Sequence, residues 1–175
     1  MALSIIVLFA AAHCFYDERV GKVLPIERFS VGFGKRKRGW DAVEEHPERV
    51  QKRDIDAIHI PPEFHGVINS KEDDIAVLVL STPIDESSYV IPACYDKVGG
   101  YEEELGRDSV GYVVGWGRTL NNIPSEELRE ANLPFISRSE CQSIVPPSFR
   151  PYILAKDRFC AGETSGGEYP SSLQI

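Results

Sequence analysis

The sequence predicts an all-β protein, and three observations lead to that class. The 175 residues are 42% apolar and 26% charged, a composition typical of a folded globular domain rather than a disordered chain. Twelve prolines and fourteen glycines are scattered along the chain and separate many short apolar runs. Such short runs with frequent turn residues favour a β-sandwich or β-barrel over a helical bundle.

The N-terminal apolar run, residues 3–9, is the first expected strand. Residues 1–12 have a second interpretation as a signal peptide, because the apolar segment ends in alanines. No lysine or arginine precedes the run, and cleavage after Ala12 would place His13 at the new terminus. These two features favour an internal strand that ends beside His13.

Four further strands are expected where apolar or alternating runs occur, at residues 29–33, 55–60, 75–80 and 110–116. The run 75–80 is nearly continuous, which predicts burial on both of its faces. Prolines, glycines and acidic residues in 91–106 predict a connector, with a boundary between two half-domains near Gly99. Ser137 is the expected N-cap of a short helix, since Glu140 follows it three residues later.

The charge distribution limits the classes of partner. The net charge of −8 argues against nucleic acid as the main partner. The local basic run Lys-Arg-Lys-Arg at residues 35–38 is interpreted as a solvated loop tip, with a binding or processing site as the alternative. No apolar stretch reaches the roughly twenty residues of a membrane-spanning helix, so no membrane insertion is expected.

Three motifs in a fixed order carry a resemblance to a known family. They are Ala-Ala-His-Cys at residues 11–14, Asp-Ile-Ala-Val-Leu at 74–78 and Gly-Trp-Gly at 115–117. In this order the chain resembles the trypsin-like serine proteases. The sequences of residues 73–80 and 89–94 are also similar to those of arthropod modular serine proteases that start immune cascades.

The resemblance implies a chymotrypsin-like double β-barrel, incomplete at both ends. Residues 1–98 would be the remainder of the first barrel, and residues 99–167 the start of the second. Residues 168–175 resemble nothing in the family and are expected to be a divergent tail.

The resemblance also assigns roles in a catalytic triad. His13 would be the general base, and Asp74 would orient its imidazole. The nucleophilic serine of a Gly-Asp-Ser-Gly-Gly motif does not occur in the sequence. Ser165, in Ser-Gly-Gly, is rejected as a substitute, because no cysteine precedes the motif and Glu163 replaces the glycine that helps to form the oxyanion hole. Ser165 is therefore expected to lie in a loop.

The four cysteines contain no Cys-x-x-Cys pair, which argues against a zinc site or a thioredoxin-like motif. The resemblance implies a disulfide between Cys141 and Cys160. It gives Cys14 a partner upstream of the chain, and it implies that Cys94 links the domain to an upstream pro-segment or module. These pairings imply a secreted protein.

The function expected from the resemblance is that of a serine endopeptidase domain acting by acyl transfer. The chain as given lacks the nucleophile and the specificity pocket and is expected to be inactive. The alternative is a non-catalytic homologue that acts as a binding or regulatory module. Protein substrates or inhibitors are the expected partners, and neither a cofactor nor a metal is expected.

Overall fold

The structure is a computed structural model that describes residues 5–66, 72–95, 105–106, 108–118, 121–148, 150 and 157–162. The chain divides into two compact units. The first unit contains residues 1–34 and 46–93, and the second contains residues 35–45 and 94–175. The predicted boundary at Gly99 lies outside the described residues.

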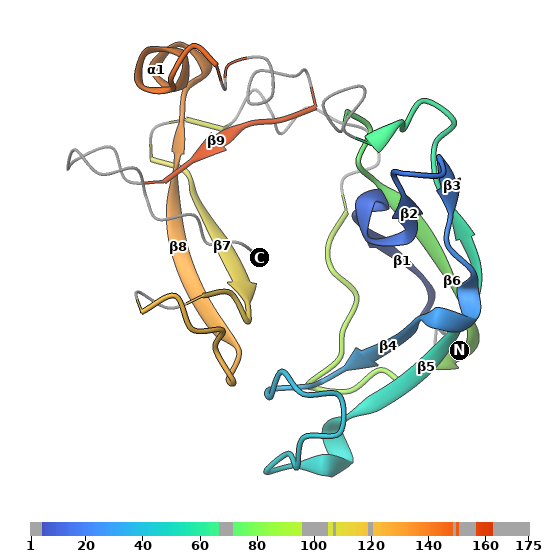
Figure 1. Ribbon diagram of the computed structural model, residues 1–175. Helices are drawn as coiled ribbons and strands as arrows, with labels where there is room; N and C mark the ends of the chain where they lie inside the picture. The colour runs from blue at the N-terminus through green and yellow to red at the C-terminus, as the bar shows by residue number, and fades with distance from the viewer. Residues whose placement is uncertain are drawn as a thin grey trace. The chain divides into compact units, whose positions relative to one another are not determined.

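Most of the described secondary structure is β (Figure 1). The strands of the first unit are β1 Ile5–Ala10, β2 Tyr16–Asp17, β3 Lys22–Val23, β4 Ser30–Phe33, β5 Gln51–His59 and β6 Ala76–Ile84. Those of the second unit are β7 Val110–Gly115, β8 Arg129–Ile136 and β9 Cys160–Ala161, together with the helix α1 Arg138–Ile144. Short 3₁₀ helices among the described residues include η1 Ala12–Phe15, η2 Ile26–Arg28 and η3 Pro47–Arg49.

The first unit is built on a curled four-stranded antiparallel sheet in the order β1-β6-β5-β4 (Figure 1). β6 lies between β1 and β5, and its residues Ala76, Leu78 and Leu80 are all buried. Val77 and Val79, on the other face of the strand, are only half-buried. The expectation of burial on both faces of this run is therefore met on one face only.

The sheet encloses two neighbouring apolar clusters. The larger one contains residues with at most 7% of their surface exposed: Ala12, Phe15, Ile55, Phe64, Ala76 and Leu78. Aromatic edge-to-face contacts reinforce it, with ring centroids 4.9 Å apart for Phe15 and Phe29 and 5.2 Å apart for Tyr16 and Phe64. The second cluster is formed by Leu80, Ile84 and Val90. Burial of these side chains supplies the main driving force for folding of this unit.

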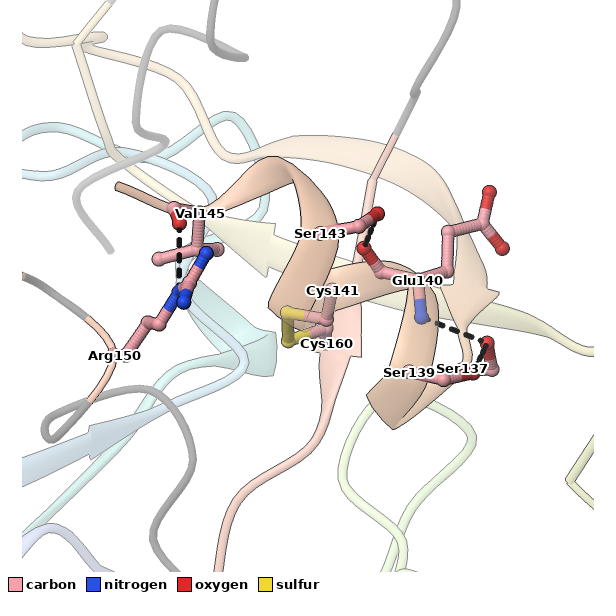
Figure 2. Close-up of a disulfide and its surroundings, with 8 residues drawn as sticks. All are labelled: Ser137, Ser139, Glu140, Cys141, Ser143, Val145, Arg150 and Cys160. Carbon is pink, nitrogen blue, oxygen red and sulfur yellow. Dashed lines mark hydrogen bonds between the residues drawn. A yellow bond between two sulfur atoms is a disulfide. The ribbon is translucent and has the colours of Figure 1, made fainter. Parts of the chain in front are cut away.

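The second unit contains the antiparallel sheet β7-β8-β9 and the helix α1. The helix begins after Ser137, whose hydroxyl accepts a hydrogen bond of 3.3 Å from the backbone N–H of Glu140. This is the N-cap that the sequence predicts. A disulfide joins Cys141 of the helix to Cys160 of β9, with Cα atoms 6.3 Å apart (Figure 2). The bridge therefore ties the helix to the edge strand of the sheet.

Removing this disulfide is expected to destabilise the second unit. Replacing both Cys141 and Cys160 with serine should lower its free energy of unfolding by about 3 kcal/mol, because the loop between them is no longer closed in the unfolded chain. Both tryptophans of the chain, Trp40 and Trp116, belong to this unit, so urea unfolding followed by tryptophan emission measures the change. The control is Cys94→Ser, and equal unfolding midpoints for the double variant and the wild type would contradict the expectation.

The sequence located most strands but not all of them. The strand interpretation of the N-terminal run is confirmed, since β1 pairs with β6 along its length. The runs at 29–33, 55–60, 75–80 and 110–116 correspond to β4, β5, β6 and β7, although β5 begins at Gln51 and β6 extends to Ile84. β8 was missed because its first half is mostly polar and Pro134 interrupts the apolar residues of its second half.

Candidate active site

The register of two strands brings His13 and Asp74 together although 61 positions separate them. In the antiparallel pair of β1 and β6, Ala10 lies opposite Ala76. His13 comes three residues after the end of β1, and Asp74 comes two residues before the start of β6. Both residues therefore belong to the same end of the pair.

His13 is carried by η1, which is fixed to the core on both sides of the histidine. Ala12 has no exposed surface, and Phe15 is 7% exposed. The backbone N–H of Cys14 donates to the carbonyl of Ala11 with a length of 3.3 Å and closes the turn. The buried neighbours hold the backbone while the imidazole itself stays 43% exposed.

Asp74 lies in a tight turn that leads into β6. Asp73 has a φ of +57°, in the left-handed region that aspartate tolerates better than most residues. The N–H of Ile75 donates to the carbonyl of Asp73 with a length of 2.7 Å, which closes the turn around Asp74. Ala76 follows with no exposed surface and anchors the turn in the core.

The Asp74 carboxylate makes two hydrogen bonds to His13. Oδ2 lies 2.6 Å from Nδ1 of the imidazole, and Oδ1 accepts the backbone N–H of His13 at 2.8 Å. The second bond fixes the rotation of the carboxylate, so that Oδ2 is held toward the ring. The sequence predicted only the contact between the carboxylate and the imidazole. The contact to the backbone N–H could not be predicted, because every residue except proline has this donor.

This pair can act as a proton acceptor with a defined tautomer. An ionised carboxylate only accepts hydrogen bonds, so Nδ1 must carry the proton and Nε2 keeps its lone pair. Nε2 is then able to take a proton from a hydroxyl group and to return it later. The imidazolium formed in between is stabilised by the adjacent negative charge.

The other candidate residues are placed as follows. Ser165 lies outside the described residues. Asp73, the residue directly before Asp74, makes neither of the two hydrogen bonds to His13. Nδ1 of His46 lies 3.2 Å from Oε1 of Glu48. Cys94 is exposed, and among the described residues it forms no disulfide.

The described residues contain neither a cluster of metal ligands nor a membrane-spanning helix. In that part of the chain no three or more histidine, cysteine, aspartate or glutamate side chains are grouped in a way that could hold a metal ion. No helix there is both long enough and apolar enough to cross a membrane.

Comparison with known proteins extends the resemblance to almost the whole chain. The family model described as Trypsin matches residues 4–171. Clotting factor C of Tachypleus tridentatus is 29% identical over 160 residues, which cover 91% of this chain and 15% of that protein. Coagulation factor IX of Oryctolagus cuniculus is 28% identical over 159 residues, which are 90% of this chain and 51% of the relative.

A third relative gives a similar result. Serine protease SSP1 of Scolopendra subspinipes is 30% identical over 143 residues, 81% of this chain and 45% of its own length. The chain thus spans from 15% to about half of the length of these three relatives. The predominantly β structure with its curled sheet agrees with the chymotrypsin-like fold that the family match indicates. With a family match over residues 4–171 and a His–Asp pair formed at the end of two paired strands, the chain belongs to the trypsin family of serine proteases.

Proposed function

We propose that this chain is part of a secreted serine endopeptidase in which His13 is the general base and Asp74 is the residue that orients it. The observation that carries the proposal is the two-point contact between the Asp74 carboxylate and His13, at 2.6 Å to Nδ1 and 2.8 Å to the backbone N–H. A contact to the ring alone would leave the carboxylate free to rotate about its side-chain bonds. Here the carboxylate is fixed so that the opposite ring nitrogen stays available at an exposed position.

The proposed chemistry is acyl transfer through a serine that lies outside these 175 residues. His13 Nε2 would take the hydroxyl proton while the serine oxygen attacks the carbonyl carbon of a peptide bond. The same nitrogen would then give that proton to the leaving amine, and water would release the acyl group in a second cycle. Asp74 would stay ionised throughout and stabilise the imidazolium.

The chain alone is proposed to be inactive. It contains no Gly-Asp-Ser-Gly-Gly motif, and Ser165 has Glu163 where the motif would supply a glycine. Without a nucleophile and without the backbone donors of an oxyanion hole, neither covalent catalysis nor stabilisation of the tetrahedral intermediate is available.

A second candidate function is that of a non-catalytic homologue acting as a binding or regulatory module. The missing nucleophile motif favours it. The intact contact between His13 and Asp74 favours the enzyme, because a binding module does not require that geometry. We therefore place the endopeptidase first.

Protein substrates or inhibitors are the proposed partners, and the proposed location is extracellular. The disulfide between Cys141 and Cys160 supports this location, because such bridges persist in oxidising compartments. Cys94 is exposed and is proposed to bridge to an upstream pro-segment or module.

Activity-based labelling tests these proposals. The native protein, purified from its source, is treated with a fluorophosphonate probe, digested and mapped by mass spectrometry, beside the recombinant 175-residue chain. We expect the probe on a serine of the native protein that lies outside the 175 residues, and no label on the recombinant chain. An unlabelled native protein would instead support the binding module.

The recombinant chain provides the decisive control. Stoichiometric labelling of Ser165, abolished by His13→Ala, would show that the chain by itself is an active protease. The rejection of Ser165 as nucleophile would then be wrong.

A further inference from the structure

The basic run at residues 35–38 belongs to a loop with its own internal support. We call residues 35–45 the basic loop. It begins after Gly34, whose φ of +67° lies in the left-handed region, and ends before His46. A side chain at Gly34 would run into the carbonyl oxygen of Arg49, so the loop starts at a turn that requires glycine. Although both flanking segments belong to the first unit, the basic loop belongs to the second.

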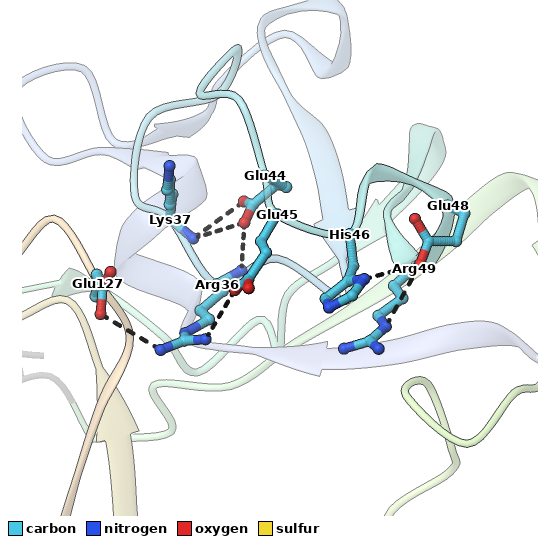
Figure 3. A network of polar contacts seen from close by, with 8 residues as sticks. All are labelled: Arg36, Lys37, Glu44, Glu45, His46, Glu48, Arg49 and Glu127. Carbon is cyan, nitrogen blue, oxygen red and sulfur yellow. Dashed lines mark hydrogen bonds and ion pairs between the residues drawn. The ribbon is translucent and has the colours of Figure 1, made fainter.

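Glu44 is the centre of this loop. Its carboxylate lies 3.1 Å from the Lys35 ammonium, and both side chains are almost fully buried, with 7% and 6% of their surface exposed. The same carboxylate accepts the backbone N–H of Lys37 at 3.0 Å and that of Arg36 at 3.3 Å (Figure 3). Burial alone would raise the pKa of Glu44, but hydrogen bonds from Lys37, Lys35 and Arg36 outweigh it and lower this pKa below its usual value.

The interpretation of residues 35–38 as a solvated loop tip is therefore correct only in part. It is wrong for Lys35, whose ammonium is buried against Glu44. It fits Arg36 and Arg38 better, since their side chains are 65% and 47% exposed. Sequence reasoning missed Glu44, because nothing in the local pattern distinguishes it from Glu45.

The backbone of the basic loop is also bound to the segment that precedes β8. The Arg36 carbonyl accepts two hydrogen bonds, from the N–H of Leu128 at 2.7 Å and from the indole of Trp116 at 2.9 Å. The N–H of Arg38 donates to the carbonyl of Glu126 at 2.9 Å. The loop thus pairs with this segment as a short antiparallel bridge.

Acidic side chains of the same segment face the two arginines. Arg38 pairs with Glu126 at 2.6 Å, and Arg36 approaches Glu127 at 3.6 Å (Figure 3 shows the latter). Arg36 also lies 3.5 Å from Glu45. Three of the four cations of the run, those of Lys35, Arg36 and Arg38, therefore lie against carboxylates of the same unit, which argues against an anionic ligand at this place.

These contacts make the run a poor protease substrate while it is folded. An endopeptidase that cleaves after arginine or lysine must bind the chain in an extended form, and here the N–H groups of residues 36–38 are already engaged. Cleavage of a folded segment proceeds through its transiently opened state. The stability of the contacts around Glu44 therefore determines how fast the basic loop is cleaved.

We propose that the bonds between Arg36 and Gly39 are a latent proteolytic processing site, kept closed by Glu44 and cleaved by an arginine- or lysine-specific endopeptidase once the basic loop opens. Hydrolysis adds one water across a single peptide bond and leaves a new carboxylate and a new amine. Three consecutive bonds qualify, so a brief opening presents several sites at once.

Limited proteolysis of the 175-residue chain with trypsin tests this. Arg19, whose side chain is 92% exposed, serves as the internal reference site. The N–H groups of residues 19–21 are also engaged, but by Asp17 within one exposed turn, whereas residues 35–38 are bound to the buried Glu44 and to the segment before β8. In the wild type we therefore expect cleavage after Arg19 well before cleavage at residues 36–38. Glu44→Gln should raise the ratio of loop to reference cleavage by about tenfold or more. The single amide oxygen cannot replace both carboxylate oxygens, so the NH₂ group faces at least one N–H donor, and Lys35 is left buried without a counter-charge.

Glu45→Gln is the matched control. Glu45 is the adjacent residue and of the same type, but it is 72% exposed and only borders Arg36, so the ratio should change by less than about twofold. Lys35→Gln is a second variant that removes the other half of the buried pair, and it should raise the ratio as well.

Three outcomes would overturn the proposal. One is a wild-type chain that is cut at residues 36–38 as readily as after Arg19. Another is an equal ratio of loop to reference cleavage in the Glu44→Gln and Glu45→Gln chains. The third is a Glu44→Gln chain cut faster at both sites by the same factor, since Glu44 would then support the whole fold rather than the loop.

Discussion

Replacing Asp74 with asparagine is expected to lower kcat by about 10⁴-fold in a form of the protein that carries the nucleophilic serine, the loss that the corresponding substitution produces in trypsin-family triads. The reason follows from the two-point contact. If Oδ1 of the new amide keeps the 2.8 Å bond to the His13 N–H, its NH₂ group faces Nδ1. The ring must then carry its proton on Nε2 and can no longer act as a base.

The tautomer change can be measured in the 175-residue chain itself. Nitrogen-15 NMR of His13 should report a proton on Nδ1 in the wild type and on Nε2 in Asp74→Asn. Asp73→Asn is the matched control: it is adjacent, and asparagine also tolerates the positive φ of this position. An unchanged tautomer in Asp74→Asn, or an equal activity loss in Asp73→Asn, would contradict the assigned role.

Phe64→Ala is expected to destabilise the first unit by about 3–5 kcal/mol, because it removes a large buried side chain and leaves a cavity. Phe64 is 2% exposed, and its ring makes an edge-to-face contact with Tyr16 at 5.2 Å. It belongs to the same cluster as Ala12 and Ala76, the residues that anchor the backbone beside His13 and Asp74. The site therefore depends on this core.

Amide hydrogen exchange in β1, β5 and β6 measures the effect, since these strands form the sheet around the core. Ile91→Ala is the control, because Ile91 is 72% exposed and its truncation should change stability by less than about 0.5 kcal/mol. Equal exchange rates in the two variants would show that Phe64 does not support the sheet.

Local sequence patterns predicted much of the fold. Alternating or continuous apolar runs located β1, β4, β5, β6 and β7, because a strand is recognisable from the spacing of its apolar side chains. The Ser-x-x-Glu pattern located the start of α1, because capping involves residues three apart. β8 has only a short alternation of apolar residues that Pro134 interrupts, and its pairing with β7 and β9 had to come from the structure.

For the candidate site too, local sequence patterns supplied one part of the description and the folded structure supplied the other. Local motifs pointed to the two residues of the proposed site, since His13 and Asp74 each stand in a motif that can be read from a few neighbouring residues. Their contact is visible only in the folded chain, because it depends on the register of β1 against β6 and joins residues 61 positions apart. The same holds for Lys35 and Glu44: their charges are evident in the sequence, but only the folded loop shows that they pair and are almost fully buried. Burial and strand register are properties of segments far apart along the chain, and no local pattern encodes them.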